Sequence, residues 1–260
     1  MSITLDSTYT LCLASQPGFR LADGVAAAVA IRADGREYAL PAGVKESGCG
    51  WEIKYHSAQW LVRDLVVPEG ECAARLERTW TYTGKGPFEG LLTIELVTAF
   101  APEFYLIPSV SYDGNRRGRG GEPKGISRGG VDWLYYYERS SLPSATFSER
   151  PGLCAGLFAG PESPHSLRSS GGFSALGEKL IHRLVYPGVE EPFVYSDTDT
   201  YAEGWRETVT LEPNRSFTAT CYLYLNAGAE FRTGWFEAFR FFFEKFVRIP
   251  ENRFSACELW

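Results

Sequence analysis

The fold class of this 260-residue chain is decided by ECAARLERTWTY (71–82), TGKGP (83–87) and FEGLLTIELVTAF (88–100). Apolar side chains occupy every second position over much of both runs, which is the period of a β-strand with one wet face. The apolar set is Cys72, Ala74, Leu76, Trp80 and Tyr82 in the first run, and Leu92, Ile94, Leu96 and Phe100 in the second. Because two glycines and a proline lie between the runs, the sequence predicts an antiparallel hairpin here.

The same alternation recurs along most of the chain. About ten such runs, separated by Gly, Pro, Asp and Asn turns, predict an all-β antiparallel sandwich or barrel. The chain shows no succession of strand–helix–strand units, which argues against a doubly wound α/β fold. The 15% aromatic content with a single Met suits pleated, half-buried surfaces.

The pattern changes to a helical period at TGWFEAFRFFFEKFVRI, residues 233–249. Phe236, Phe239, Phe243 and Phe246 fall on one face, and Thr233 is a suitable N-cap. A proline directly after the segment marks its end. We therefore expect a β domain over residues 1–230, and a C-terminal helix and tail over 231–260 that lead toward a further domain. A helix this aromatic covers a sheet or meets a surface outside the chain.

The composition of the chain argues against several classes of binding partner. The net charge of −6 argues against general binding to nucleic acid or to an anionic membrane surface. No apolar run reaches the roughly 18–20 residues that span a bilayer, and the N-terminus does not resemble a secretion signal. Scattered cysteines without a C-x-x-C pattern indicate free thiols, so we expect a cytoplasmic protein. No metal-ligand spacing or nucleotide motif is present, so we expect neither a metal nor a cofactor.

A long basic loop interrupts this acidic chain at YDGNRRGRGGEPKGISRGGVD, residues 112–132. Loops longer than about 12–15 residues without structure of their own are usually functional or disordered. Glycine N–H groups and arginine side chains could bind a phosphate, sulfate or uronate. A solvated loop and a loop that docks on another domain or subunit are the alternatives.

The order of elements resembles a known family at two places. Pro108, Tyr112, Gly114 and Asn115 end a strand in the pattern Pro-x-x-x-Tyr-x-Gly-Asn, and Thr210, Leu211 and Pro213 precede a strand and the aromatic helix. This layout resembles the β-supersandwich domain, of galactose-mutarotase-like fold, that precedes the helical (α/α)6 catalytic domain of bacterial glycoside hydrolases and phosphorylases. The resemblance implies a carbohydrate ligand, a helical catalytic domain or second subunit as partner, and a rim loop from the β domain.

Candidate site residues follow from the loop and this resemblance. The expected sugar-binding residues are Tyr112, Asn115, Arg116, Arg119, Lys124, Asp132 and Trp133. Glu149, Asp132 and Glu203 are the carboxylates considered for glycoside chemistry, which needs two acids about 5–10 Å apart. His182 is in phase with apolar neighbours, which indicates an inward, hydrogen-bonded histidine.

Three functions remain open. The leading hypothesis is a carbohydrate-associated domain without a complete active site, which lines a sugar cleft and packs on a helical catalytic domain. A stand-alone aldose epimerase or lyase-like enzyme would need His182 or His56 to meet an acid in one pocket. A non-catalytic interaction module would use the basic loop to bind an acidic partner.

Overall fold

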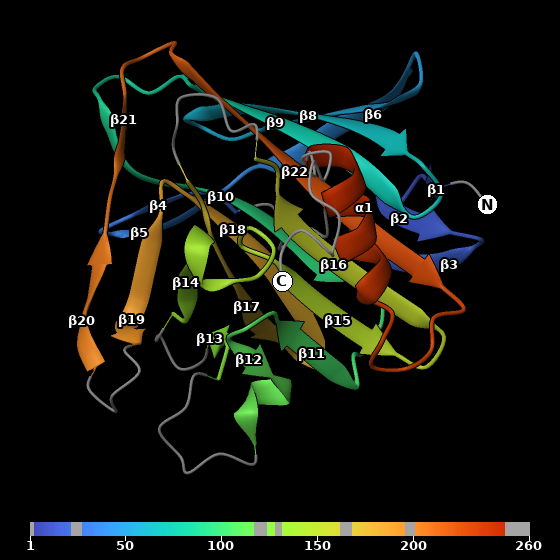
Figure 1. Ribbon diagram of the computed structural model, residues 1–260. Helices are drawn as coiled ribbons and strands as arrows, with labels where there is room; N and C mark the ends of the chain where they lie inside the picture. The colour runs from blue at the N-terminus through green and yellow to red at the C-terminus, as the bar shows by residue number, and fades with distance from the viewer. Residues whose placement is uncertain are drawn as a thin grey trace, which may run out of the picture.

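The computed structural model describes residues 3–21, 28–116, 124–127, 132–161, 168–195 and 201–247. Within these residues two large sheets lie face to face, with one α-helix beside them (Figure 1). All described strand pairs are antiparallel except β13 (Ile126–Ser127) with β17 (Ser170–Leu176), which is parallel. The predicted all-β sandwich with a C-terminal helix is confirmed.

The 13-stranded sheet of the described chain contains β1 (Ile3–Leu5), β2 (Thr10–Leu13), β3 (Gln16–Arg20), β4 (Ala28–Arg32), β5 (Gly35–Tyr38), β10 (Phe88–Thr98), β13, β14 (Leu134–Tyr136), β17, β18 (Lys179–Tyr186), β19 (Val189–Tyr195), β20 (Tyr201–Arg206) and β21 (Val209–Leu211). The 9-stranded sheet of the same residues contains β6 (Leu40–Ser47), β7 (Gly50–His56), β8 (Trp60–Glu69), β9 (Ala73–Tyr82), β11 (Phe104–Ile107), β12 (Ser111–Tyr112), β15 (Thr146–Arg150), β16 (Leu153–Ala159) and β22 (Ser216–Ala227). Two short 3-10 helices, η1 (Asp113–Asn115) and η2 (Tyr137–Arg139), follow β12 and β14.

The predicted hairpin of residues 71–100 is wrong, because β9 and β10 belong to different sheets. β9 pairs with β8 and β22, whereas β10 pairs with β18, β3, β4 and β21. The turn between them carries the chain from one sheet to the other. Across the interior, Phe88 of β10 packs against Tyr82 of β9 at 5.8 Å and Trp60 of β8 at 4.8 Å between ring centroids. The alternation correctly gave the buried face of each strand, but the two faces pack on one another.

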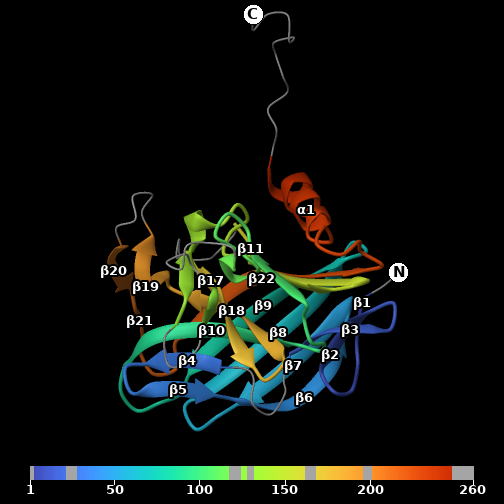
Figure 2. The ribbon, with the colours of Figure 1, turned by 90° about the horizontal axis from the view of Figure 1, so that it is seen from below.

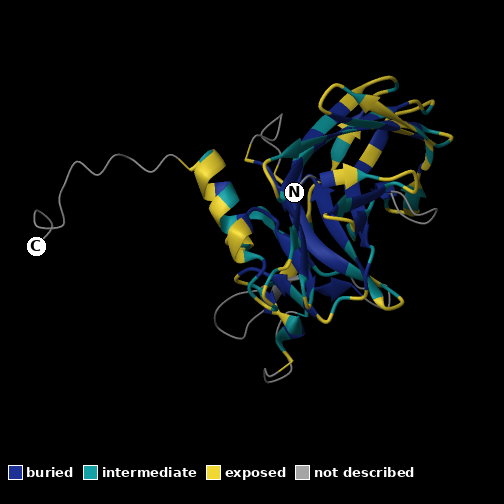
Figure 3. Ribbon diagram, turned by 90° about the vertical axis from the view of Figure 1, so that its right-hand side faces the viewer, coloured by how far each residue is buried: buried dark blue, intermediate teal, exposed yellow. Residues whose placement is uncertain are grey.

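The main core lies between the sheets. Its fully buried members include Trp60, Trp80, Phe88, Leu92 and Leu184, which come from both sheets. The dark blue of buried residues in Figure 3 is concentrated in these facing strands. Neighbouring residues in a strand point to opposite faces of the sheet. The residues that alternate with the core residues therefore lie on the outer face.

A buried ion pair also lies in this core. Arg78 of β9 and Asp64 of β8 are opposite one another in register, and both are fully buried. The guanidinium donates through Nε and Nη2 to the two carboxylate oxygens, each at 2.7 Å, and through Nη1 to the Thr93 carbonyl at 3.2 Å. Arg78 is in phase with the inward-facing residues Leu76 and Trp80, but no local pattern indicates Asp64 as its partner.

The C-terminal helix α1 (Phe236–Phe246) lies against the 9-stranded sheet (Figure 2). Ala238 and Phe242 are its buried residues, and they pack against a cluster that includes Phe158 of β16 and Tyr222 of β22. The predicted apolar stripe is therefore wrong in part, because Phe236 and Phe243 are 55% and 45% exposed. The aromatic residues of this helix lie on more than one of its faces, so their spacing alone did not identify the buried face.

The predicted N-cap is also wrong. The helix begins at Phe236 with Trp235 as its N-cap residue, and the Thr233 hydroxyl donates to the Glu230 carbonyl instead. No described helix has the length and apolar character needed to cross a membrane.

Candidate functional site

A ring of four charged side chains lies on the face of the 13-stranded sheet that points away from the core. Glu95 of β10 and Arg183 of β18 are direct partners in register, and their strand neighbours Ile94 and Leu184 face the core. Glu95 and Arg183 must therefore project from the other face. Arg36 of β5 and Asp132, two residues before β14, complete the group.

Each guanidinium in this charge ring contacts both carboxylates. Arg36 donates to Glu95 at 2.9 Å and to the two oxygens of Asp132 at 3.1 and 3.2 Å. Arg183 donates through Nε to Glu95 at 3.1 Å and through Nη1 to Asp132 at 2.8 Å. Glu95 and Arg183 are nearly inaccessible, whereas the Asp132 side chain keeps 22% of its surface exposed. The Arg36 side chain keeps 28% exposed, so the ring opens to solvent at Arg36 and Asp132.

The ring keeps Asp132 ionised. Burial opposes the charged form, but the nearby positive charges of Arg183 and Arg36 outweigh it, so the pKa of Asp132 lies below its usual value. Burial also opposes the charge of Arg36, and Glu95 and Asp132 overcome this, so the pKa of Arg36 is raised. An ionised carboxylate held by two guanidinium groups is a fixed hydrogen-bond acceptor.

Asp132 also lines a pocket of about 390 Å³ beside β19 and β20, which we call the Trp205 pocket. The other lining residues are Glu191, Pro192, Glu203, Gly204, Trp205 and Arg206. Gly204 lies so close to the opposite strand that a Cβ there would come within 2.5 Å of the Glu190 carbonyl oxygen. A side chain at this position would therefore displace β20 from β19 and alter the pocket.

The lining of the Trp205 pocket combines charged and aromatic side chains. Arg206 binds Glu191 through Nε at 2.8 Å and Nη2 at 2.6 Å. Trp205 is half-buried and meets Tyr136 edge to face, with ring centroids 4.9 Å apart. Glu203 is exposed. Fixed carboxylates beside an indole ring can accept hydroxyl hydrogen bonds while the ring covers an apolar face of the ligand.

Most of the predicted loop residues lie elsewhere in the structure. Tyr112 is 52% exposed at the end of β12. Asn115 stabilises η1, because its amide donates to the Val110 carbonyl at 3.0 Å and its oxygen accepts from the Tyr112 N–H at 3.0 Å. Arg116 is exposed and lies 3.4 Å from the carboxylate of Asp113. Arg119 falls outside the described residues.

Backbone groups of Lys124 and Trp133, at the end of the predicted loop, make hydrogen bonds. The Lys124 carbonyl accepts from the Tyr105 hydroxyl at 3.1 Å, which fixes the backbone there. The backbone N–H of Trp133 donates to the Ser127 hydroxyl at 2.9 Å, and the Trp133 side chain is half-buried. Of the seven predicted binding residues, Asp132 alone lines the Trp205 pocket in the part of the chain that is described.

The structure brings two of the three candidate carboxylates together and separates the third. Asp132 and Glu203 line the same pocket. Glu149 is buried near the start of α1, where it accepts the Arg232 N–H at 2.5 Å. Burial raises the pKa of Glu149, although the Arg232 N–H lowers it. Glu149 therefore anchors the segment before α1 and does not share a pocket with Asp132.

Neither His56 nor His182 lines the Trp205 pocket. The prediction of an inward His182 is confirmed: its Nδ1 lies 2.9 Å from the Thr146 hydroxyl and its Nε2 lies 2.8 Å from that of Ser148. Complete burial lowers the pKa of His182 to about 3. His56 is exposed on β7 of the other sheet, and His165 is outside the described residues.

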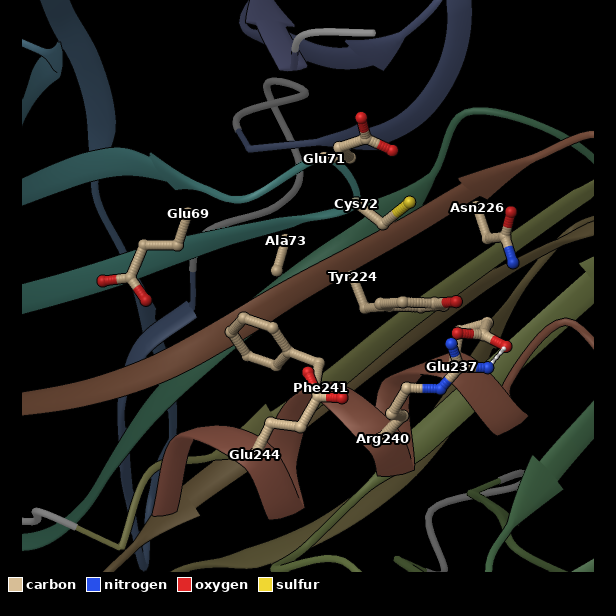
Figure 4. A pocket seen from close by; sticks show the side chains of 10 residues that line it. All are labelled: Glu69, Glu71, Cys72, Ala73, Tyr224, Asn226, Glu237, Arg240, Phe241 and Glu244. Carbon is tan, nitrogen blue, oxygen red and sulfur yellow. Dashed lines mark hydrogen bonds and ion pairs between the residues drawn. The ribbon is translucent and has the colours of Figure 1, made fainter.

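A second pocket, of about 340 Å³, lies between α1 and the 9-stranded sheet (Figure 4). Tyr224 and Cys72 form its sheet side, and Phe241 and Arg240 come from the helix. Its Arg240 is paired with Glu237 of the same helix. The described residues contain no group of three or more His, Cys, Asp or Glu side chains placed to hold a metal.

No family model matches the sequence, and no curated protein matches it. Solved structures that resemble the chain include a TPR-domain protein from Parabacteroides distasonis, with 13% identity, 84% of this chain and 38% of that chain covered, and a TM-score of 0.41. A protein from Escherichia coli provisionally named an aldose 1-epimerase has 10% identity, 84% and 91% coverage, and a TM-score of 0.43. A heparan sulfate lyase from Pedobacter heparinus has 7% identity, 75% and 23% coverage, and a TM-score of 0.33.

The chain thus spans well under half of the TPR-domain protein and of the lyase. It has the two facing antiparallel sheets that the resemblance to the galactose-mutarotase-like fold implied. At these identities and TM-scores, the similarity carries no activity to the chain.

Proposed function

We propose that the chain binds a carbohydrate in the Trp205 pocket, as a domain without a complete active site of its own. The observation that carries this proposal is the double role of Asp132. Its carboxylate is fixed by Arg36 and Arg183 and also lines an open pocket with Trp205. A preorganised acceptor beside an aromatic ring is what recognition of a hydroxyl-rich ring requires.

The stand-alone epimerase or lyase-like alternative receives no support from the described histidines. It required His182 or His56 to meet an acid in one pocket. His182 is enclosed between the sheets and bound by two hydroxyl groups. General acid–base catalysis needs a proton donor within hydrogen-bond reach of the ligand, and neither histidine lines the Trp205 pocket.

The proposed partner is a helical catalytic domain or a second subunit, and its contact surface is the outer face of α1. Phe236 and Phe243 are 55% and 45% exposed at positions i and i+7 of the helix. Val247, directly after the helix, is 38% exposed. Figure 3 shows yellow, exposed residues along the side of α1 that faces away from the sheets. An apolar stripe at this spacing is typical of helix-to-helix packing. Figure 1 shows α1 well separated from β19 and β20, so such a partner need not block the pocket.

A glycan array followed by calorimetry with the best ligand tests the binding proposal. Trp205→Ala should weaken binding about tenfold, the equivalent of roughly 1.4 kcal/mol from one aromatic contact. Glu212→Gln, at an exposed glutamate in the turn after β21, is the matched control and should leave affinity unchanged. No affinity for any glycan would refute the proposal. If Arg116→Ala lost binding and Trp205→Ala kept it, the binding site would be the basic loop instead of the Trp205 pocket.

A further inference from the structure

The Trp205 pocket contains one carboxylate that no described cation balances. Asp132 lies between Arg36 and Arg183, and Glu191 is paired with Arg206. Glu203 is exposed at the pocket and has no ion-pair partner within the described residues. The inference below rests on the proposed function, because it concerns the chemistry of the ligand in that same pocket.

The charge balance around the pocket is negative. The charge ring and the pocket together hold four carboxylates, from Glu95, Asp132, Glu191 and Glu203. They hold three guanidinium groups, from Arg36, Arg183 and Arg206. Every one of these guanidinium groups already contacts a carboxylate. An acidic group on a ligand would therefore meet the free charge of Glu203 without gaining a free cation from the described lining.

We propose that the pocket selects sugars without acidic groups, and that Glu203 is the residue that determines this specificity. A hydroxyl or ammonium group of the ligand can donate to Glu203, whereas the carboxylate of a uronic acid is repelled by it. Because the site is open to solvent, the repulsion is that of two partly screened charges. It corresponds to about two- to fivefold weaker binding of a uronate than of the matching neutral sugar.

Matched ligand pairs test this directly. Affinities of the methyl glycosides of glucose and galactose are compared with those of methyl glucuronide and methyl galacturonide, by NMR titration at low ionic strength. The neutral member of each pair should bind about two- to fivefold more tightly. Raising the salt concentration should reduce that difference, since exposed charges are screened.

A pair of variants assigns the effect to one residue. In Glu203→Gln, the ratio of uronate affinity to neutral affinity should rise about two- to fivefold. In Glu207→Gln, a neighbouring exposed glutamate that does not line the pocket, the ratio should change by less than about 1.5-fold. Preferential binding of a uronate by the unmodified chain would overturn the inference and leave the proposed function intact. An unchanged ratio in Glu203→Gln would overturn the role of Glu203. If no glycan binds in the array or in this titration, the proposed function fails, and the inference fails with it.

Discussion

Replacing Asp64 by Asn should be among the most destabilising single changes in the core. The substitution keeps the shape of the side chain and removes the charge that balances Arg78. The guanidinium would be left fully buried, with the Thr93 carbonyl at 3.2 Å and the ring faces of Tyr55 and Trp80 at 5.5 and 5.9 Å. None of these carries a full negative charge. Breaking a buried ion pair in this way costs about 3–5 kcal/mol.

The assays are urea denaturation and thermal denaturation of the whole chain, each monitored by fluorescence and circular dichroism. At roughly 2–4 °C per kcal/mol for a domain of this size, the loss corresponds to a melting temperature lowered by about 6–20 °C. The double variant Asp64→Val with Arg78→Leu removes both charges and should be as stable as the original protein, or about 1–4 kcal/mol more stable. The reasoning would be refuted by a loss below about 1 kcal/mol in Asp64→Asn, which is the cost of a solvated pair.

Three further outcomes follow from the buried polar groups. Burial lowers the pKa of His182 from 6.5 to about 3, so the unfolded chain takes up this proton at a higher pH than the folded chain. The free energy of unfolding should therefore decrease as the pH falls from about 6.5 to 3. This dependence on pH should become weaker in His182→Gln. Glu149→Ala removes the acceptor of the Arg232 N–H, so amide hydrogen exchange in α1 should accelerate while exchange in β10 stays slow. Cys49 is exposed and should react with a thiol reagent in the folded protein, whereas buried Cys154 and Cys221, whose thiol pKa values are raised by burial, should react only on unfolding, as read by mass spectrometry.

The alternation of the sequence predicted buried faces well and strand partners poorly. Trp80 and Tyr82 face the core as their phase required, and so does His182. The same pattern cannot distinguish two strands that share hydrogen bonds from two strands whose faces pack together. This is why the run to Tyr82 and the run from Phe88 were joined in one sheet, although the structure places them in two.

The candidate site was only partly predictable for a related reason. Asp132 could be selected because it lies at the end of an unusual loop beside aromatic residues. Glu95 lay in the outward phase of its run, but its partners Arg36 and Arg183 are 59 and 88 residues away in the chain. A local sequence pattern does not indicate contacts between residues that are so far apart in the chain. The charge ring therefore emerges only from the sheet, in which β4 lies between β5 and β10, and β18 lies on the other side of β10.

The two groups of buried charges in this protein differ in the feature that matters for function. Arg78 and Asp64 are enclosed on all sides between the sheets, so no ligand can reach them. The charge ring is built in the same way from arginine and carboxylate, yet Asp132 keeps 22% of its side chain exposed and borders a pocket. Burial of Glu95 and Arg183 fixes the orientation of Asp132, and its exposed edge offers that fixed acceptor to a ligand. Recognition needs a residue that is held rigidly and is also accessible to the ligand. The binding proposal therefore depends on Asp132 rather than on the core pair.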